Sequence, residues 1–198
     1  MFTLWWLRFS CGVRHEVKGL ENLPEQTAII MSKHQSTWET IGLRGLLRPD
    51  QSWVLKQELM RLPIFGLGLR YCKSIPIDRS AGRRAVVKVV EQGMARLAEG
   101  RYVVIFPEGT RSEDGQLLPF KKGGFHLALK SRAEVVPVAI IGSRQIVPKG
   151  SLRINRGAFA MDIGTSIAST DYSKEDMPEL MARTREHMRK GMKEESAC

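Results

Sequence analysis

The run YVVIF at residues 102–106 is the feature that most limits what this chain can fold into. A strand with one solvent-facing side alternates apolar and polar residues, whereas a continuous apolar run is typical of a strand covered on both faces. Similar runs occur at residues 27–31 and 135–141, and segments with helical periodicity lie between them. Strands that alternate with helices predict an α/β fold, here a mixed, mostly parallel β-sheet flanked by helices.

The 198 residues are enough for one well-buried core, so we predict a single α/β domain over residues 13–170. An aromatic segment, residues 1–12, precedes it, and a charged amphipathic helix, residues 171–198, follows it. Methionines recur along one stripe of that helix, which predicts that it docks on the domain. Further strands are expected at residues 13–18, 52–56, 74–77 and within 152–164, and helices at residues 37–47, 80–99 and 124–131.

The chain carries 31 basic and 21 acidic residues, a net charge of +10. Such a charge suits an anionic partner, which is nucleic acid, an anionic membrane surface or a phosphorylated substrate. Aromatic residues do not interleave with a basic stripe, so no nucleic-acid partner is predicted. The three cysteines are widely spaced and the four histidines do not stand at ligand spacing. Neither a disulfide framework nor a protein-held metal is therefore predicted.

Two apolar segments are candidates for contact with lipid, although neither has the roughly 18 to 20 uninterrupted apolar residues of a membrane-spanning helix. Trp5 and Trp6 suit a membrane interface, and packing on the domain's own core is the alternative. Residues 58–71 are largely apolar but contain Pro63 and two glycines. We expect this segment to line an acyl groove or lie in a membrane interface, with a buried helical hairpin as the alternative.

His34 and Glu39 form a candidate catalytic pair directly after the strand predicted at residues 27–31. A neutral imidazole can take up a proton near neutral pH, and a carboxylate on its other nitrogen fixes the tautomer and stabilises the imidazolium. The alternative is structural, because residues 36–39 (STWE) match the capping box S-x-x-E, in which the glutamate closes a helix N-terminus.

The loop PEGTR at residues 107–111 is a candidate anion site. Gly109 permits a close approach of the backbone to a ligand, successive N–H groups can surround an anion, and Arg111 offers a planar pair of donors to phosphate. Arg79 and Lys121 would add positive charge to the same site. A tight turn with a solvated Arg111, and a local ion pair of Arg79 with its neighbouring aspartate, are the alternatives.

Other chemistries lack their motifs. The sequence has no G-x-S-x-G nucleophile elbow, no G-x-x-x-x-G-K-[ST] phosphate loop and no H-E-x-x-H zinc helix. A base without an obvious covalent nucleophile, beside a site for a phosphorylated ligand and among apolar segments, favours direct transfer to a hydroxyl of an amphipathic phosphate ester. The developing oxyanion needs donors, for which backbone N–H groups near His34 or at Gly109 are candidates.

Four ordered segments complete the pattern: residues 34–39 (HQSTWE), 75–79 (IPIDR), 106–112 (FPEGTRS) and 136–140 (VPVAI). Together they resemble the motifs of the glycerolipid acyltransferases, in particular the bacterial 1-acyl-sn-glycerol-3-phosphate acyltransferases, and they imply that family's α/β fold. The resemblance also implies conversion of lysophosphatidic acid to phosphatidic acid in phospholipid biosynthesis. Acyl-CoA or the acyl carrier protein (acyl-ACP) would be the co-substrate, with no cofactor.

By the same resemblance His34 and Glu39 are catalytic. The family's phosphate-binding positions correspond to Arg79, Glu108, Gly109, Thr110 and Arg111; Lys121 and Lys122 are further candidates on charge alone. The family usually has aspartate where this chain has Glu39, so the reach of the longer side chain to His34 is a question for the structure. The implied location is the cytoplasmic face of the inner membrane, bound peripherally or anchored by the N-terminus.

Two competing interpretations stay open. The first is a non-catalytic peripheral module that recognises anionic lipid headgroups through its +10 charge. The second is an acyltransferase for another acceptor, such as a lyso-ornithine lipid or glycerol 3-phosphate. Whichever lipid an acyltransferase of this kind acylates, the donor thiolate leaves readily, so no acyl-enzyme is required. Cys72 is therefore expected to be an inert core residue.

Overall fold

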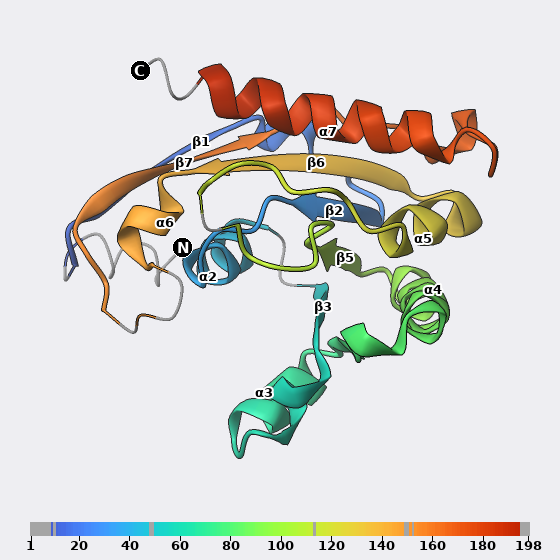
Figure 1. The fold of residues 1–198 in the computed structure, drawn as a ribbon, viewed down its shortest axis with the longest axis horizontal. Helices are drawn as coiled ribbons and strands as arrows, with labels where there is room; N and C mark the ends of the chain where they lie inside the picture. The colour runs from blue at the N-terminus through green and yellow to red at the C-terminus, as the bar shows by residue number, and fades with distance from the viewer. Residues whose placement is uncertain are drawn as a thin grey trace.

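The computed structural model describes residues 9, 11–47, 50–112, 114–148, 151 and 153–194. The described strands form a sheet of seven strands in the order β1-β7-β6-β2-β5-β3-β4 (Figure 1). Neighbouring strands are parallel except β6 and β7, which are antiparallel. The strands are β1 (Val13–Lys18), β2 (Ala28–Ser32), β3 (Gln51–Lys56), β4 (Ile75–Ile77), β5 (Tyr102–Ile105), β6 (Glu134–Ile141) and β7 (Gly157–Ile163).

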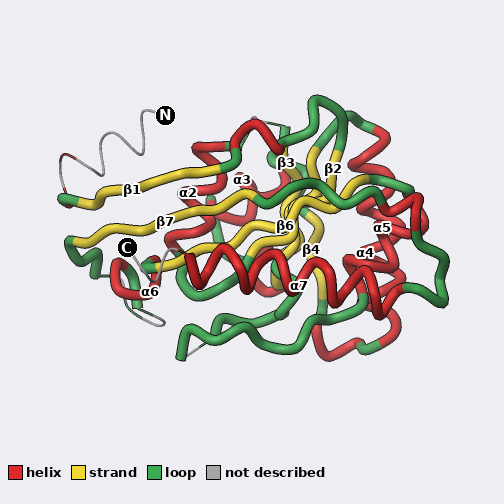
Figure 2. Tube along the Cα trace, turned by 90° about the horizontal axis from the view of Figure 1, so that it is seen from above, coloured by secondary structure: helices red, strands yellow, loops and turns green. Residues whose placement is uncertain are grey.

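Helices cover both faces of this sheet. The α-helices are α2 (Trp38–Leu46), α3 (Phe65–Tyr71), α4 (Arg83–Ala98), α5 (Gly123–Ser131), α6 (Ser143–Ile146) and α7 (Met177–Glu194). The short 3-10 helices are η1 (Leu20–Asn22), η2 (Gln57–Arg61), η3 (Arg79–Ala81) and η4 (Ser169–Asp171). Helices α4, α5 and α7 pack on one face, and α2 and α6 on the other (Figures 1 and 2).

The two faces explain the continuous apolar runs of the central strands. In β2, Ile29 packs with Phe125 of α5, whereas its neighbour Ile30 packs with Leu43 of α2 on the opposite face. All of these side chains are fully buried. Because successive side chains of a strand point to opposite faces, a strand covered on both sides has no position for a polar residue. The predicted α/β fold with a mixed, mostly parallel sheet is confirmed.

Element boundaries differ from those expected by a few residues, mostly for local reasons. The segment at 152–164 contains a single strand, β7. The helix expected from residue 80 begins at Arg83, because Asp78 accepts a hydrogen bond from the Ser80 N–H (2.9 Å) and so caps the separate turn η3. Gly82 follows with a non-helical φ of +52°, so η3 does not continue into α4. The four-residue helix α6 was not predicted, since it is too short to show a helical period.

Several candidate residues follow the carboxyl ends of parallel strands. His34 comes after β2, residues 106–111 come after β5, and Arg79 comes after β4. These strands and β3 are parallel neighbours in the sheet. The carboxyl ends of parallel strands share one edge of the sheet, where ligands of α/β proteins bind. The fold therefore brings these segments to one edge.

The two ends of the chain are described to different extents. Trp5 and Trp6, expected at a membrane interface, lie outside the described residues. Within the described part of the chain, no helix is long and apolar enough to cross a membrane. At the other end of the chain, Met188 and Leu180 of α7 are fully buried in the core cluster formed by the sheet, α4 and α5. The predicted docking of this helix is confirmed.

Candidate active site

His34 and Glu39 are in direct contact. The Nδ1 atom of His34 lies 2.8 Å from Oε2 of Glu39, which is fully buried in the first turn of α2. The His34 side chain keeps 15 % of its surface exposed. No described residue forms a hydrogen bond to its Nε2 atom, so this second ring nitrogen remains available to a substrate. The extra methylene of Glu39 does not prevent the contact.

An aromatic residue fixes the plane of the imidazole. The ring of Phe106, which directly follows β5, stacks on His34 with centroids 3.9 Å apart and 15° between the planes. Trp53 of β3 in turn packs against Phe106 at 5.8 Å. The imidazole is thus held at its edge by a carboxylate and on its face by a ring.

Glu39 makes the contacts that both interpretations of it require, through different oxygen atoms. Oε2 faces His34, while Oε1 accepts hydrogen bonds from the backbone N–H groups of Gln35 (2.9 Å) and Ser36 (2.8 Å). Oε1 also accepts from the Ser143 hydroxyl at 2.6 Å. The contact with the Ser36 N–H is the glutamate half of a capping box. The cap and the His34 contact are therefore not alternatives.

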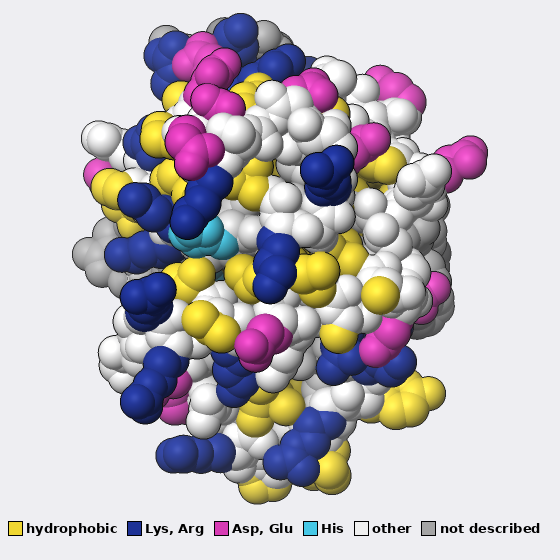
Figure 3. All heavy atoms as spheres, turned by 90° about the vertical axis from the view of Figure 1, so that its right-hand side faces the viewer, with side chains coloured by type: hydrophobic (Ala, Val, Ile, Leu, Met, Phe, Trp, Pro, Cys, Tyr) yellow, Lys and Arg dark blue, Asp and Glu magenta, His cyan; other side chains and the backbone are white. Residues whose placement is uncertain are grey.

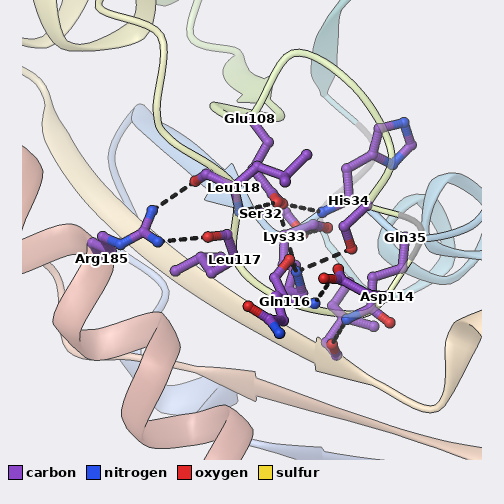
Figure 4. A network of polar contacts seen from close by, with 12 residues as sticks. Ser32, Lys33, His34, Gln35, Glu108, Asp114, Gln116, Leu117, Leu118 and Arg185 are labelled. Atoms are coloured by element: carbon purple, nitrogen blue, oxygen red, sulfur yellow. Dashed lines mark hydrogen bonds and ion pairs between the residues drawn. The ribbon is translucent and has the colours of Figure 1, made fainter.

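A buried lysine lies immediately before His34 (Figure 4). The Lys33 side chain is fully buried, and its ammonium group lies 3.6 Å from Oε2 of Glu108, which is also fully buried. Lys33 donates to the carbonyl of Gln116 at 2.7 Å and to the Ser112 hydroxyl at 3.4 Å. Burial lowers the pKa of Lys33, and the Glu108 carboxylate opposes that shift.

Glu108 faces the protein interior, which corrects its expected place among the phosphate-binding residues. Its Oε1 accepts from the backbone N–H of His34 at 2.9 Å, and its Oε2 accepts from that of Leu118 at 2.8 Å. Both oxygens are therefore engaged inside the protein and the side chain is sealed from solvent. A carboxylate is also repelled by a phosphate, so Glu108 joins the loop at residues 106–118 to the end of β2 instead of binding the anion.

The same loop is tied to the C-terminal helix. Arg185 of α7 donates to the carbonyl oxygens of Leu117 and Leu118 (Figure 4). Its guanidinium also lies over the Phe120 ring, 5.4 Å from the ring centroid. The loop that carries Gly109, Thr110 and Arg111 is consequently held from two sides, by β2 and by α7.

Arg111 lies beside the candidate catalytic pair, and the guanidinium of Arg79 lies near that of Arg111. Arg111 donates to the Thr37 hydroxyl at 3.0 Å, within the segment that separates His34 from Glu39. Partial burial and the nearby Arg111 charge lower the pKa of Arg79, while Glu58 opposes them. Arg79 stays charged at neutral pH, because the unperturbed pKa of arginine lies far above that pH. Two repelling cations beside a base form a site that an anion would stabilise.

The turn at residues 107–110 is shaped by Gly109. Its φ is +71°, a conformation that other residues rarely adopt, and an added Cβ would lie 3.3 Å from Cγ of Lys121. The Lys121 N–H donates to the Pro107 carbonyl at 2.7 Å. Thr110 and Lys121 are exposed on this turn. The structure therefore brings Gly109, Thr110 and Lys121 beside Arg111.

The backbone donors expected for an oxyanion are already in use. The N–H of His34 donates to Glu108, those of Gln35 and Ser36 donate to Glu39, and that of Gly109 donates to the Phe106 carbonyl at 3.0 Å. These four candidate donors therefore have protein partners and are not free for a reacting oxygen.

Sequence reasoning missed Lys33 and Ser143. Ser143 lies 104 residues from Glu39 in an unpredicted helix, so no local spacing could reveal it. Lys33 adjoins the candidate base His34, and its side chain is buried against Glu108. Only its unusual place, a charged residue at the end of an apolar strand, could have drawn attention to it.

No group of three or more potential metal ligands occurs in the part of the chain that the structure describes. A cavity of about 850 Å³ lies between α4, α5 and η4, where Arg83, Lys122, His126 and Lys130 are among its lining residues. Its lining includes neither His34 nor Glu39. The cavity is thus separate from the candidate catalytic pair.

Comparison with known proteins agrees with these motifs. The sequence profile of the Acyltransferase family matches residues 14–141. The chain is 41% identical to the 1-acyl-sn-glycerol-3-phosphate acyltransferase of Pseudomonas aeruginosa, over 92% of this chain and 70% of that protein. It is 29% identical to the human 1-acyl-sn-glycerol-3-phosphate acyltransferase alpha, over 92% of this chain and 65% of that protein.

A solved structure has the same fold over the full chain. The crystal structure of the 1-acyl-sn-glycerophosphate (LPA) acyltransferase from Thermotoga maritima matches with a TM-score of 0.83 and 28% identity, covering 100% of this chain and 76% of that one. The family profile spans well over half of the 198 residues. The chain belongs to the Acyltransferase family.

Proposed function

We propose that the protein transfers a fatty acyl group from acyl-CoA or acyl-ACP to the sn-2 hydroxyl of 1-acyl-sn-glycerol 3-phosphate and so forms phosphatidic acid. The observation that carries this proposal is the contact of His34 with the buried Glu39, beside the two arginines of the anion site. The names of the P. aeruginosa and human relatives support the acceptor and the reaction.

His34 acts as the general base through Nε2. Since Glu39 accepts a hydrogen bond at Nδ1, the neutral ring carries its proton there and leaves Nε2 unprotonated. Nε2 takes the proton of the sn-2 hydroxyl as that oxygen attacks the thioester carbonyl. Glu39 stabilises the resulting imidazolium, and Phe106 keeps the ring in plane. The carbon–oxygen bond forms, the carbon–sulfur bond breaks, and the imidazolium returns the proton to the departing thiolate.

No covalent acyl-enzyme takes part in this scheme. Cys72 precedes β4, and its thiol accepts a hydrogen bond from Arg44. Its carbonyl accepts from Arg101, which directly precedes β5. These contacts keep Cys72 near the amino ends of the strands, opposite the edge that carries His34. A thiolate with a pKa of about 8.5 is a sufficient leaving group without prior transfer to the enzyme.

Arg79 and Arg111 bind the acceptor phosphate, with Gly109, Thr110 and Lys121 at the rim of the site. Arg111→Ala should raise KM for the lysophosphatidate about 10- to 100-fold, because a charge-assisted hydrogen bond is lost, and should leave KM for acyl-CoA within about threefold. Steady-state kinetics with each substrate varied in turn measure both values. Arg14→Ala, an exposed arginine on β1, is the matched control. An equal effect on both substrates would argue against an acceptor-phosphate role.

Glu39 is tested by two substitutions. Glu39→Gln keeps an oxygen for the Gln35, Ser36 and Ser143 donors but puts an amide NH₂ against Nδ1, so the ring must change tautomer. We expect kcat to fall by about 10⁴-fold, as for other catalytic histidines that lose their carboxylate, with little change in the unfolding free energy. Glu39→Asp keeps the charge and should retain substantially more activity than Glu39→Gln. Loss of stability with unchanged kcat would leave only the capping role.

The acceptor is identified by an assay on the purified protein. Acyl-CoA is supplied with lysophosphatidate, a lyso-ornithine lipid or glycerol 3-phosphate in turn, and release of the CoA thiol is followed. Release that depends on lysophosphatidate supports the proposal. Faster thiol release with another acceptor would make that lipid the substrate in place of lysophosphatidate. If no acceptor led to thiol release, a non-catalytic lipid-binding module would be favoured.

We further propose a peripheral location at the cytoplasmic face of the inner membrane. The net charge of +10 supports contact with anionic lipids, and the acceptor and product are themselves amphiphiles of the bilayer.

A further inference from the structure

Residues 57–71, formed by η2 and α3, expose most of their large apolar side chains. Ile64 is 85 % exposed, Leu67 is 67 % exposed and Tyr71 is 91 % exposed, and Leu59, Leu62 and Phe65 are also exposed. The buried helical hairpin considered for this segment is therefore wrong. We call residues 57–71 the apolar projection.

The apolar projection has a defined conformation. An added Cβ on Gly66 would lie 2.3 Å from the backbone oxygen of Met60, so η2 and α3 approach each other more closely than any other residue would allow. The Gly66 N–H donates to the Leu62 carbonyl at 2.8 Å. At the tip, Ile64 has a φ of +61°, which is costly for a β-branched residue. Specific packing thus holds the apolar side chains outward.

The apolar projection leaves the sheet beside the candidate site. Figure 1 shows α3 extending away from the layers of the domain below β3. At its base, Lys88 of α4 lies 3.5 Å from the Gln57 side-chain oxygen, and the nearby Glu58 carboxylate partly offsets the lowering of the Arg79 pKa by burial. A lipid substrate held in a layer that contacts the apolar projection would therefore lie close to the anion site.

Positive charge accompanies the apolar residues. Figure 3 shows Lys and Arg side chains interleaved with hydrophobic ones at its lower end, the level of α3 in Figure 1. Arg61 and Arg70 are exposed, and within the described part of the chain neither is paired with a carboxylate. Apolar side chains flanked by unpaired cations match an anionic bilayer, which offers hydrocarbon beneath a layer of phosphates.

We propose that the apolar projection inserts into the interface of an anionic bilayer and docks the protein beside its lipid substrate. This inference rests on the proposed function for the identity of that substrate. Leu62, Ile64, Phe65 and Leu67 enter the acyl boundary, while Arg61 and Arg70 contact lipid phosphates. Removal of this apolar surface from water compensates for its exposure in the free protein.

The test measures partition of the full chain onto vesicles of equimolar phosphatidylcholine and phosphatidylglycerol by cosedimentation. Phe65→Gln/Leu67→Gln keeps the net charge and should lower the partition coefficient about tenfold or more. Leu20→Gln/Val87→Gln, a control at two positions of similar exposure outside the projection, should change it less than about twofold. Equal partition of the two variants would overturn the proposal, as would a change in oligomeric state of Phe65→Gln/Leu67→Gln without vesicles.

Activity separates this inference from the proposed function. With a short-chain, monomeric lysophosphatidate in solution, Phe65→Gln/Leu67→Gln should turn over like the wild type, and only vesicle-borne acceptor should be used more slowly. Wild-type binding to vesicles without turnover of either acceptor would sink the proposed function but keep the docking surface. Equal loss on both acceptors would mean that the substitutions damage the enzyme itself, which contradicts a docking role.

Discussion

Replacing His34 with alanine is expected to lower kcat for acyl transfer by about 10³-fold or more, because the reaction loses the base that takes the hydroxyl proton. The sn-2 hydroxyl is a poor nucleophile while protonated, and the neighbouring Glu39 is sealed behind the imidazole with its Oε1 occupied by three donors. In the described part of the chain, no other side chain is therefore placed to act as the base instead of His34. Initial rates of thiol release with lysophosphatidate measure the loss.

The fold should survive this substitution. The His34 side chain is partly exposed, and the principal contacts that it gives up are the Glu39 hydrogen bond and the stack on Phe106. His126→Ala, a histidine of α5 outside the site, is the matched control and should keep its turnover. Turnover by a folded His34→Ala protein close to the wild-type rate would remove His34 from the mechanism.

The Lys33 and Glu108 pair should produce the largest change in stability. Lys33→Met leaves the fully buried Glu108 carboxylate without its cation, and loss of one partner of a buried ion pair costs about 3–5 kcal/mol. Because Glu108 also holds the His34 N–H and the Leu118 N–H, activity should fall with stability. Urea unfolding measures the free energy. The double variant Lys33→Met/Glu108→Gln removes both charges and should recover part of the loss.

An exposed ion pair provides the comparison. Arg189→Met removes the exposed i,i+3 pair with Glu186 and should cost no more than about 1 kcal/mol. If Lys33→Met lowered the unfolding free energy no more than Arg189→Met does, the buried network would not hold the loop. If the double variant were no more stable than Lys33→Met, the pair would not be coupled as its geometry indicates.

The sequence predicted those parts of the site that are local in the chain. His34 and Glu39 are five positions apart on either side of one helix start, so a pattern can reveal their contact, and the structure places them at 2.8 Å. The α/β architecture was also predictable, because a strand buried on both faces must be apolar throughout, as Ile29 and Ile30 are. Both features depend on residues that are close together in the sequence.

Features that depend on distant segments or on side-chain direction were not predictable. A motif containing Glu108 does not say whether the carboxylate faces a ligand or a buried lysine, and it faces Lys33. Ser143 reaches Glu39 from a segment 104 residues away. The composition of residues 58–71 fits a membrane interface, an acyl groove or a buried hairpin, and only the tertiary structure, which exposes Ile64, Leu67 and Tyr71, excludes the hairpin. In each case the deciding partner is absent from the local sequence.

A single-turnover experiment tests the central claim, direct transfer by the His34 and Glu39 pair, most directly. Enzyme in excess over acyl-labelled acyl-CoA is quenched at short times with and without lysophosphatidate, and the label is located by mass spectrometry of intact protein and lipid. We predict that the label moves from the thioester to the sn-2 position of phosphatidic acid, with no acylated protein at any time and no transfer by His34→Ala. Label on the protein before it reaches lipid, or transfer that persists in His34→Ala, would contradict the mechanism.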